Sequence, residues 1–172
     1  MFMAGFLFRL QKCSNMKIFV DADACPVAVR KLLQSKFSQQ KHISVYFVSS
    51  YHHQLGLFFD NIHHVVVDAH REAADMYMMN HVRERDIVIT QDIGLASVIL
   101  SKNAYVISFK GKQYTNDTID EHLFFRHINS KRRRAGQKTN GPKKYTSYDL
   151  KKFESTLNKI LAKEGFLSYS LE

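Results

Sequence analysis

"KIFVDADACPVAVRKLL" (residues 17–33) contains the clearest indication of the fold class. Its first half is an apolar run rich in strand-forming residues, and its second half carries an apolar helical stripe. Pro26 suits the first turn of a helix. The stretch therefore predicts a buried strand that turns directly into a helix, with Asp21 and Asp23 at the turn.

The rest of the chain repeats this alternation of strand and helix. Strand-like runs cover residues 43–50, 63–68, 86–91 and 104–109, and helix-like segments cover residues 71–82, 94–103, 118–129 and 147–163. Strands that alternate with helices predict a mostly parallel sheet with crossover helices. We expect an α/β, doubly wound, five-stranded sheet with helices on both faces. Ligands of such sheets bind beyond the carboxyl ends of the strands.

The length of 172 residues predicts one domain, which we place at residues 16–165. Residues 1–15 are expected to be a flexible extension and residues 166–172 a C-terminal tail. Residues 2–8 are apolar, but no basic residue precedes them, which is atypical of a signal peptide. A start codon placed before the native Met16 and a short membrane-surface anchor stay open as readings.

The composition predicts a cytoplasmic protein. No apolar run approaches the roughly 20 residues of a membrane span. Cys13 and Cys25 are too few for a disulfide framework and fit a reducing compartment. The sequence leaves the oligomeric state open.

Acidic residues gather at the carboxyl ends of the predicted strands. Asp21 and Asp23 close the first strand, and Asp92 follows the fourth. Asp86 begins that fourth strand, and six residues of about 3.3 Å each place it roughly 20 Å from Asp92. Asp86 is therefore excluded from the site.

The helix after the third strand adds further carboxylates. Glu72 and Asp75 are three residues apart, so they can share a helix face, and Asp68 ends the strand before them. We expect Asp75 to join Asp21, Asp23 and Asp92, with Asp68 and Glu72 peripheral.

Such a cluster needs a compensating charge, since two carboxylates 4 Å apart repel by about 4 kcal/mol at an effective dielectric of 20. Either one holds a proton or a cation lies between them. Oxygen ligands favour Mg²⁺ or Mn²⁺. A metal held by Asp21, Asp75 and Asp92, assisted by Asp23, predicts phosphodiester hydrolysis.

Structural roles stay open for the same residues. Asp92 and Asp23 each precede a helix and suit N-caps, and Asp75 is also typical of a solvated helix surface. Thr90 either orients a ligand water or fills a strand position. Cys25 lies near a helix N-terminus, but no histidine is placed to activate it, so a small buried residue is expected.

A basic loop is predicted at residues 131–144, which contain seven Lys and Arg residues and no Asp or Glu. The whole chain has a net charge of +9. Such a segment favours a polyanion, and RNA is the expected partner. The expected contacts are Arg132, Arg133, Arg134, Lys138, Lys143 and Lys144. Flanking aromatic side chains either stack on bases or pack in the core, namely Phe124, Phe125, Tyr145 and Tyr148.

Five motifs resemble one family: "VDADACPV", "AADMYMMN", "DIVITQDIGLA", "GKQYTNDTI" and "GPKKYTSYDLKKF". From Met16 to Leu161 the chain resembles the YaiI/YqxD family of uncharacterised bacterial proteins, regarded as PIN-like. PIN domains are metal-dependent ribonucleases. The resemblance implies that Asp21, Asp75 and Asp92 match their acidic residues, whereas Asp23 has no assured counterpart.

Three functions follow as hypotheses. The first is an Mg²⁺- or Mn²⁺-dependent ribonuclease, and the second is a non-catalytic RNA-binding protein whose aspartates are caps. The third is a phosphatase of the haloacid dehalogenase type, because "IFVDADAC" resembles its D-x-D start. Cys25 stands where that class usually has Thr or Val, and no later G-D-x-x-x-D pair appears.

Overall fold

The computed structural model describes residues 15–50, 59–70, 72–135 and 144–167. The strands are β1 (Met16–Asp21), β2 (Ile43–Ser49), β3 (Ile62–Val66), β4 (Ile87–Ile89), β5 (Tyr105–Ile107) and β6 (Gln113–Tyr114). The helices are α1 (Val27–Phe37), α2 (Ala73–His81), α3 (Ile93–Leu100), α4 (Asn116–Arg134) and α5 (Ser147–Lys163).

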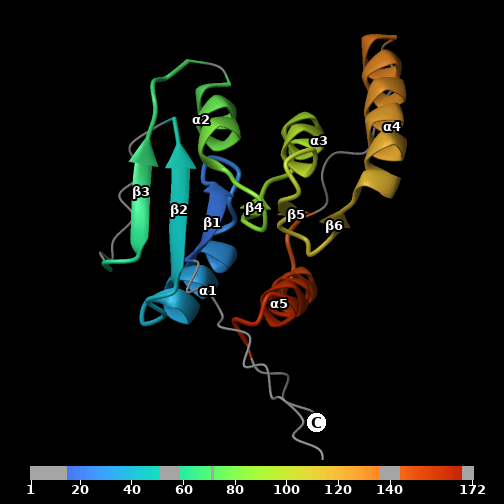
Figure 1. Cartoon of the computed structure of the whole chain (residues 1–172). Coiled ribbons are helices and arrows are strands. Elements are labelled where there is room, and N and C mark those ends of the chain that lie inside the picture. The colour runs from blue at the N-terminus through green and yellow to red at the C-terminus, as the bar shows by residue number, and fades with distance from the viewer. Residues whose placement is uncertain (1–14, 51–58, 71, 136–143, 168–172) are drawn as a thin grey trace, which may run out of the picture.

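The strands form one sheet in the order β3-β2-β1-β4-β5-β6 (Figure 1). The pairs among β1 to β5 are parallel, and β6 pairs antiparallel with β5. The mostly parallel sheet is therefore confirmed, but the expected five strands are wrong. β6 is only two residues long, which is too short for a hydrophobic alternation to be recognised in the sequence.

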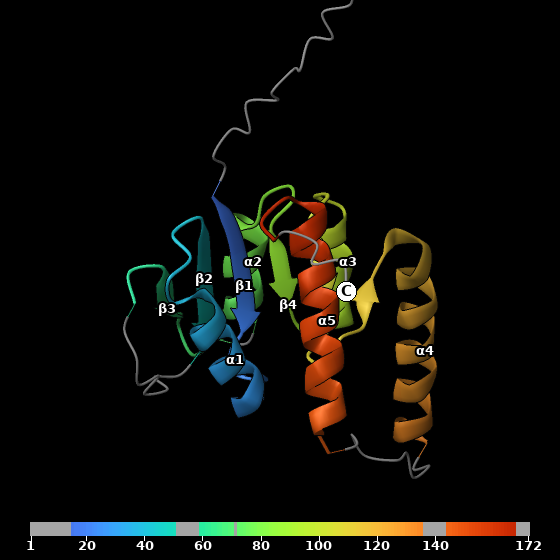
Figure 2. The same ribbon diagram turned by 90° about the horizontal axis from the view of Figure 1, so that it is seen from below.

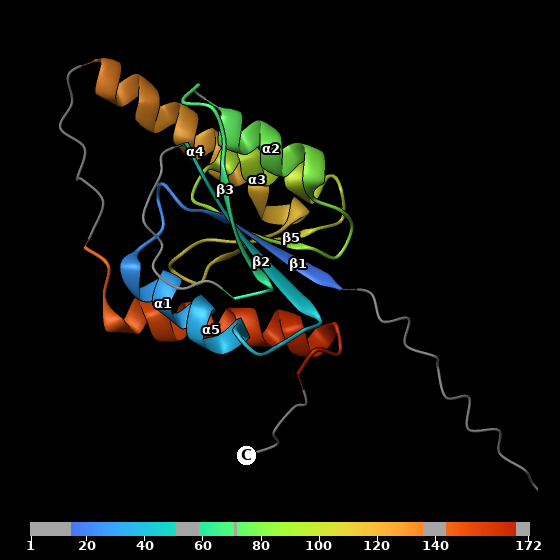
Figure 3. The same cartoon turned by 90° about the vertical axis from the view of Figure 1, so that its left-hand side faces the viewer.

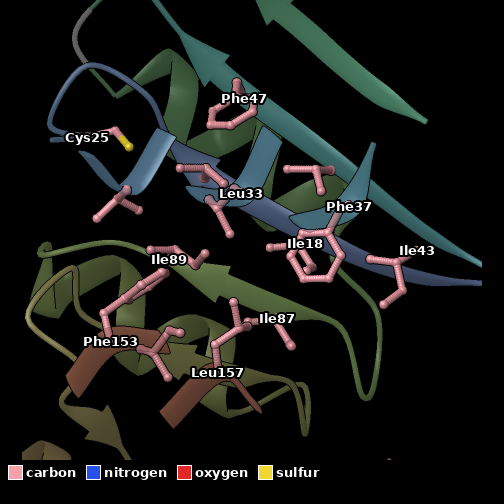
Figure 4. Packing of buried hydrophobic residues seen from close by; sticks show 14 of the residues in the cluster. Ile18, Cys25, Leu33, Phe37, Ile43, Phe47, Ile87, Ile89, Phe153 and Leu157 are labelled. Atoms are coloured by element: carbon pink, nitrogen blue, oxygen red, sulfur yellow. The ribbon is translucent and has the colours of Figure 1, made fainter. Parts of the chain in front are cut away.

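Helices cover both faces of the sheet, as the doubly wound prediction requires (Figure 3). The α1 and α5 helices lie together on one face, and α2, α3 and α4 lie on the other (Figures 2 and 3). Side chains of β1 alternate between these layers. Ile18 packs in the layer of Leu33 and Phe153, as Figure 4 shows, whereas Phe19 packs in the layer of Met78.

The α4 helix corrects the predicted basic loop. It extends to Arg134, so residues 131–134 are helical, and the expected helix end near Asn129 is wrong. Arg and Lys are good helix formers and are favourable near a helix C-terminus. In both Figure 1 and Figure 3, α4 continues past the edge where the parallel strands end.

The α5 helix closes the described domain. It begins with a capping box between Thr146 and Asp149, and the predicted stop is confirmed, because Gly165 follows its end with φ of 81°. Glu164 forms an ion pair with Arg85 and accepts a hydrogen bond from Tyr105, at the amino edge of the sheet. Most of the predicted extension and tail lie outside the described residues. In the described ranges we find no helix long and apolar enough to cross a membrane.

Candidate active site at the carboxyl edge

Asp21 ends β1 and faces the neighbouring strand β4. Its Oδ2 accepts a hydrogen bond from Thr90 Oγ1 at 3.2 Å. Burial raises the pKa of Asp21, and the charges of Asp23 and Asp92 raise it further. The Thr90 hydroxyl opposes this shift by stabilising the ionised form. The carboxyl group is thus half-buried and close to other acids.

Thr90 links Asp21 to Asp92. It lies directly after β4 and is fully buried. Its hydroxyl oxygen accepts a hydrogen bond from the backbone amide of Asp92 at 3.0 Å, while donating to Asp21. Its own amide donates to the Ile107 carbonyl at 3.1 Å. Thr90 therefore fixes the relative positions of two of the expected site residues.

Asp92 is the N-cap of α3, which confirms the capping interpretation for this residue. Its Oδ1 accepts hydrogen bonds from the amides of Gly94 and Leu95, at 2.6 and 3.2 Å. The same oxygen pairs with Arg126 of α4. Three donors thus converge on one carboxylate oxygen.

Asp75 lies in the first turn of α2 and faces the same region. Its pKa is raised by burial first and then by the charges of Asp92, Asp21 and Glu72, whereas Arg126 lowers it. The carboxylates at the end of β1 and the start of α3 are therefore close enough to Asp75 to raise its pKa. We call Asp21, Asp75 and Asp92, with Thr90, the acidic corner.

Asp23 lies beside this corner and has a different local role. Its Oδ2 accepts hydrogen bonds from the amide and the hydroxyl of Ser50, at 2.9 and 2.7 Å. It is not a helix cap, because Pro26 is the N-cap of α1. The capping interpretation of Asp23 is therefore wrong, and the residue connects the ends of β1 and β2.

The two expected peripheral acids lie at the margin. Asp68 is exposed two residues beyond β3 and is not among the main charges acting on Asp21 or Asp75. Glu72 is the N-cap of α2 in the left-handed region, with φ of 73°, so it precedes the helix instead of sharing its face with Asp75.

Asp86 lies at the opposite edge, as expected. It is buried, and its carboxylate accepts hydrogen bonds from the amides of Lys17 and Arg83 at 3.1 and 2.9 Å. Lys17 lies at the amino end of β1, and Arg83 lies in the turn between α2 and β4. The predicted position of Asp86 at the edge opposite Asp21 and Asp92 is confirmed.

The fit of a divalent cation depends on how many ligands it takes from the protein. Among the residues that the structure describes, no three His, Cys, Asp or Glu side chains form a group that could hold a metal ion. This excludes a closed cage of three carboxylates in that part of the chain. Mg²⁺ keeps several waters and uses one or two carboxylates. The oxygen donors and raised pKa values of Asp21 and Asp75 fit such a hydrated ion.

Cys25 is buried in the core beside α1 (Figure 4). Burial raises the pKa of its thiol to about 12, so the thiolate is not accessible at neutral pH. The expectation of a small buried residue is confirmed.

The expected nucleic-acid contacts divide into three groups. Arg132 and Arg134 are exposed on α4, and Arg133 belongs to the same helix. Lys144 is exposed before α5, and Lys138 and Lys143 lie outside the described residues.

The flanking aromatic residues also divide. Tyr145 is half-buried and donates a hydrogen bond from its hydroxyl to the Phe109 carbonyl, so it packs against the domain. Phe124, Phe125 and Tyr148 are exposed.

Two residues of this region have no signal in the sequence. Arg126 stands 34 positions from its partner Asp92, and Ser50 stands 27 positions from Asp23. Neither belongs to a local motif, and only the packing of α4 on α3 and the pairing of β1 with β2 bring them to the site.

A model of the family described as "Uncharacterized BCR, YaiI/YqxD family" matches residues 19–163. The chain belongs to the YaiI/YqxD family. The UPF0178 protein of Bacillus velezensis is 45% identical over 99% of this chain and 100% of its own length. That of Bacillus pumilus is 46% identical, over 88% of this chain and 90% of its own. No solved structure matches this family member.

Proposed function

We propose that this protein is a nuclease that hydrolyses phosphodiester bonds of RNA and depends on Mg²⁺ or Mn²⁺. The observation that carries the proposal is that burial raises the pKa of both Asp21 and Asp75 at the carboxyl edge of the sheet, and that the charge of Asp92 raises both further. Carboxylates that destabilise one another's charge gain from a cation. This edge is also where α/β sheets bind ligands.

The side chains have distinct proposed roles. Asp21, Asp75 and Asp92 would hold a hydrated cation, one or two of them directly and the rest through its waters, with Asp23 as an auxiliary. A bound Mg²⁺ or Mn²⁺ supplies Lewis-acid polarisation of the scissile phosphate. Thr90 keeps the Asp21 carboxylate in place through its hydroxyl. The residues proposed to contact the RNA backbone are Arg132, Arg133, Arg134, Lys138, Lys143 and Lys144.

The test is cleavage of labelled single-stranded RNA by the full chain, with Mn²⁺ or with EDTA. Asp21→Asn and Asp92→Asn should each lower the rate by more than about 100-fold, above the 10–100-fold typical of losing an outer-shell partner. Asn is as good an N-cap as Asp, so Asp92→Asn removes the charge and keeps the cap. Asp149→Asn, in the capping box of α5, is the matched control and should cleave normally.

A second candidate is non-catalytic RNA binding, which the capping role of Asp92 favours. It predicts equal RNA affinity with Mn²⁺ and with EDTA, and no cleavage. Metal-dependent cleavage that survives both Asn variants would rule out the assignment of the acidic corner. A phosphoryl group trapped on Asp21 would instead favour the phosphatase hypothesis.

A further inference from the structure

We propose that the outer face of α4 binds single-stranded nucleic acid by stacking bases on Phe124 and Phe125. We define this face by Phe124, Phe125, Lys131 and Arg132. The inference rests on the proposed function for the class of ligand, and it adds the strand state of that ligand. It also adds a binding surface distinct from the acidic corner.

The two phenylalanines form an exposed aromatic pair. The side chains of Phe124 and Phe125 are 61% and 52% exposed. Their ring centroids lie 6.1 Å apart and their planes differ by 67°, so the rings are not stacked on each other. Burying one phenylalanine is worth about 1.5–3 kcal/mol. Two adjacent exposed rings therefore indicate a surface that contacts a partner.

The helix turns these rings away from the domain. Ile119 and Leu123 pack into the core layer with α3, and Arg126, in the middle of α4, pairs with Asp92. Residues seven apart lie on nearly the same face of an α-helix. Lys131 therefore lies on the same side of α4 as Phe124, and Arg132 on the same side as Phe125. Both basic side chains are exposed.

The charge of the helix selects the partner. No acidic residue follows Glu121 in α4, while the second half of the helix carries Arg126, Lys131 and residues 132–134. A second copy of the chain would bring like charges together, whereas a nucleic acid complements them. Bases are free to stack on aromatic rings in a single strand, but they are stacked on one another in a duplex. The combination of exposed phenylalanine rings and basic side chains on α4 thus fits a single-stranded nucleic acid.

The position of α4 connects this face to the proposed chemistry. The C-terminal half of the helix continues beyond the carboxyl edge of the sheet, where the acidic corner lies (Figures 1 and 3). A single strand of nucleic acid that lies along α4 would therefore pass beside the edge that holds the acidic corner.

The experiment measures binding without cleavage. A labelled oligouridine and the same strand paired with oligoadenosine are titrated with the full chain in EDTA, and fluorescence anisotropy reports affinity. The double variant Phe124→Leu/Phe125→Leu should bind the single strand about tenfold more weakly, with little change for the duplex. Arg132→Gln should lower the slope of log affinity against log salt by about one.

Val66→Ala is the matched control. Val66 is 42% exposed at the end of β3, the edge strand at the other side of the sheet from β6, so its change should leave affinity unchanged. Because the changed rings are exposed, the double variant should keep the circular dichroism and melting temperature of the parent protein.

Each outcome separates this inference from the proposed function. Unchanged affinity of the double variant for the single strand overturns the stacking site, even if cleavage still depends on Asp21. Unchanged affinity accompanied by a shift from dimer to monomer in sedimentation assigns the face to contact between copies, and also overturns it. Weaker binding by the double variant in a protein that never cleaves RNA supports the stacking site and removes only the nuclease.

Discussion

Arg126 Nη1 lies 3.1 Å from Asp92 Oδ1, and this pair joins α4 to the acidic corner. The two side chains are 50% and 38% exposed, and exposed pairs of this kind are worth about 0–1 kcal/mol. Arg126 is therefore a counter-ion that a divalent cation can displace from Asp92 at small cost.

Removing this counter-ion should strengthen cation binding. We expect Arg126→Met to bind Mn²⁺ about fivefold more tightly in isothermal titration calorimetry, the equivalent of ~1 kcal/mol. Arg132→Met removes a charge that lies six residues further along the same helix, and should have little effect. Equal or weaker Mn²⁺ binding by Arg126→Met would contradict the competition.

The Thr90 hydroxyl should contribute to both stability and cation binding. Thr90→Val keeps the shape but removes a donor to Asp21 and an acceptor of the Asp92 amide. Leaving buried groups unsatisfied costs about 1–3 kcal/mol, which urea unfolding would measure. Thr156→Val, which loses one hydrogen bond to the Gly111 carbonyl, is the control. It should lower stability alone, whereas Thr90→Val should also weaken Mn²⁺ binding.

Asp21 should destabilise the protein above its folded pKa. The folded state raises this pKa from the ordinary 3.8, so it retains the proton longer than the unfolded chain. The free energy of unfolding therefore falls as pH rises from about 4 through the folded pKa. We expect Asp21→Asn to melt at a higher temperature than the parent protein at pH 7, with the difference vanishing below that window.

Asp149 supplies the control of opposite sign. Hydrogen bonds from Thr146 lower its pKa in the folded state, so its charge stabilises the fold at neutral pH and that contribution is lost as pH falls. Asp149→Asn should therefore melt lower at pH 7 and approach the parent in acid. A loss of stability at pH 7 for Asp21→Asn would contradict its assigned burial.

Gly111 should be indispensable to the packing of α5. Its φ is 74°, and a Cβ built there would lie 2.5 Å from the backbone of Lys152 and Phe153. Gly111→Ala should cost more than the roughly 1 kcal/mol of a left-handed alanine, because backbone atoms must move apart. Gly165→Ala, at a φ of 81°, is the control that has only the cost of the left-handed alanine. Urea unfolding would measure the free energy of unfolding of both variants. Similar losses for the two variants would contradict this contact.

Hydrophobic periodicity and turn residues predicted most of the fold, because both are properties of consecutive residues. The turn after β1 was predicted from one apolar run and Pro26, and the stop of α5 from Gly165. β6 escaped because two residues carry no period. The end of α4 was misplaced because a run of bases suits a solvated loop and a helix C-terminus equally well, and helix propensity decided between them.

Local sequence patterns were enough to predict which end of a strand an aspartate occupies, and this separated Asp86 from Asp21 and Asp92. Only the tertiary structure decided the partners of these carboxylates: Thr90 for Asp21, Ser50 for Asp23 and Arg126 for Asp92. Strand order and helix packing set those contacts. Strand ends follow from local periodicity, whereas contacts between residues 27 to 69 positions apart follow from how the layers pack.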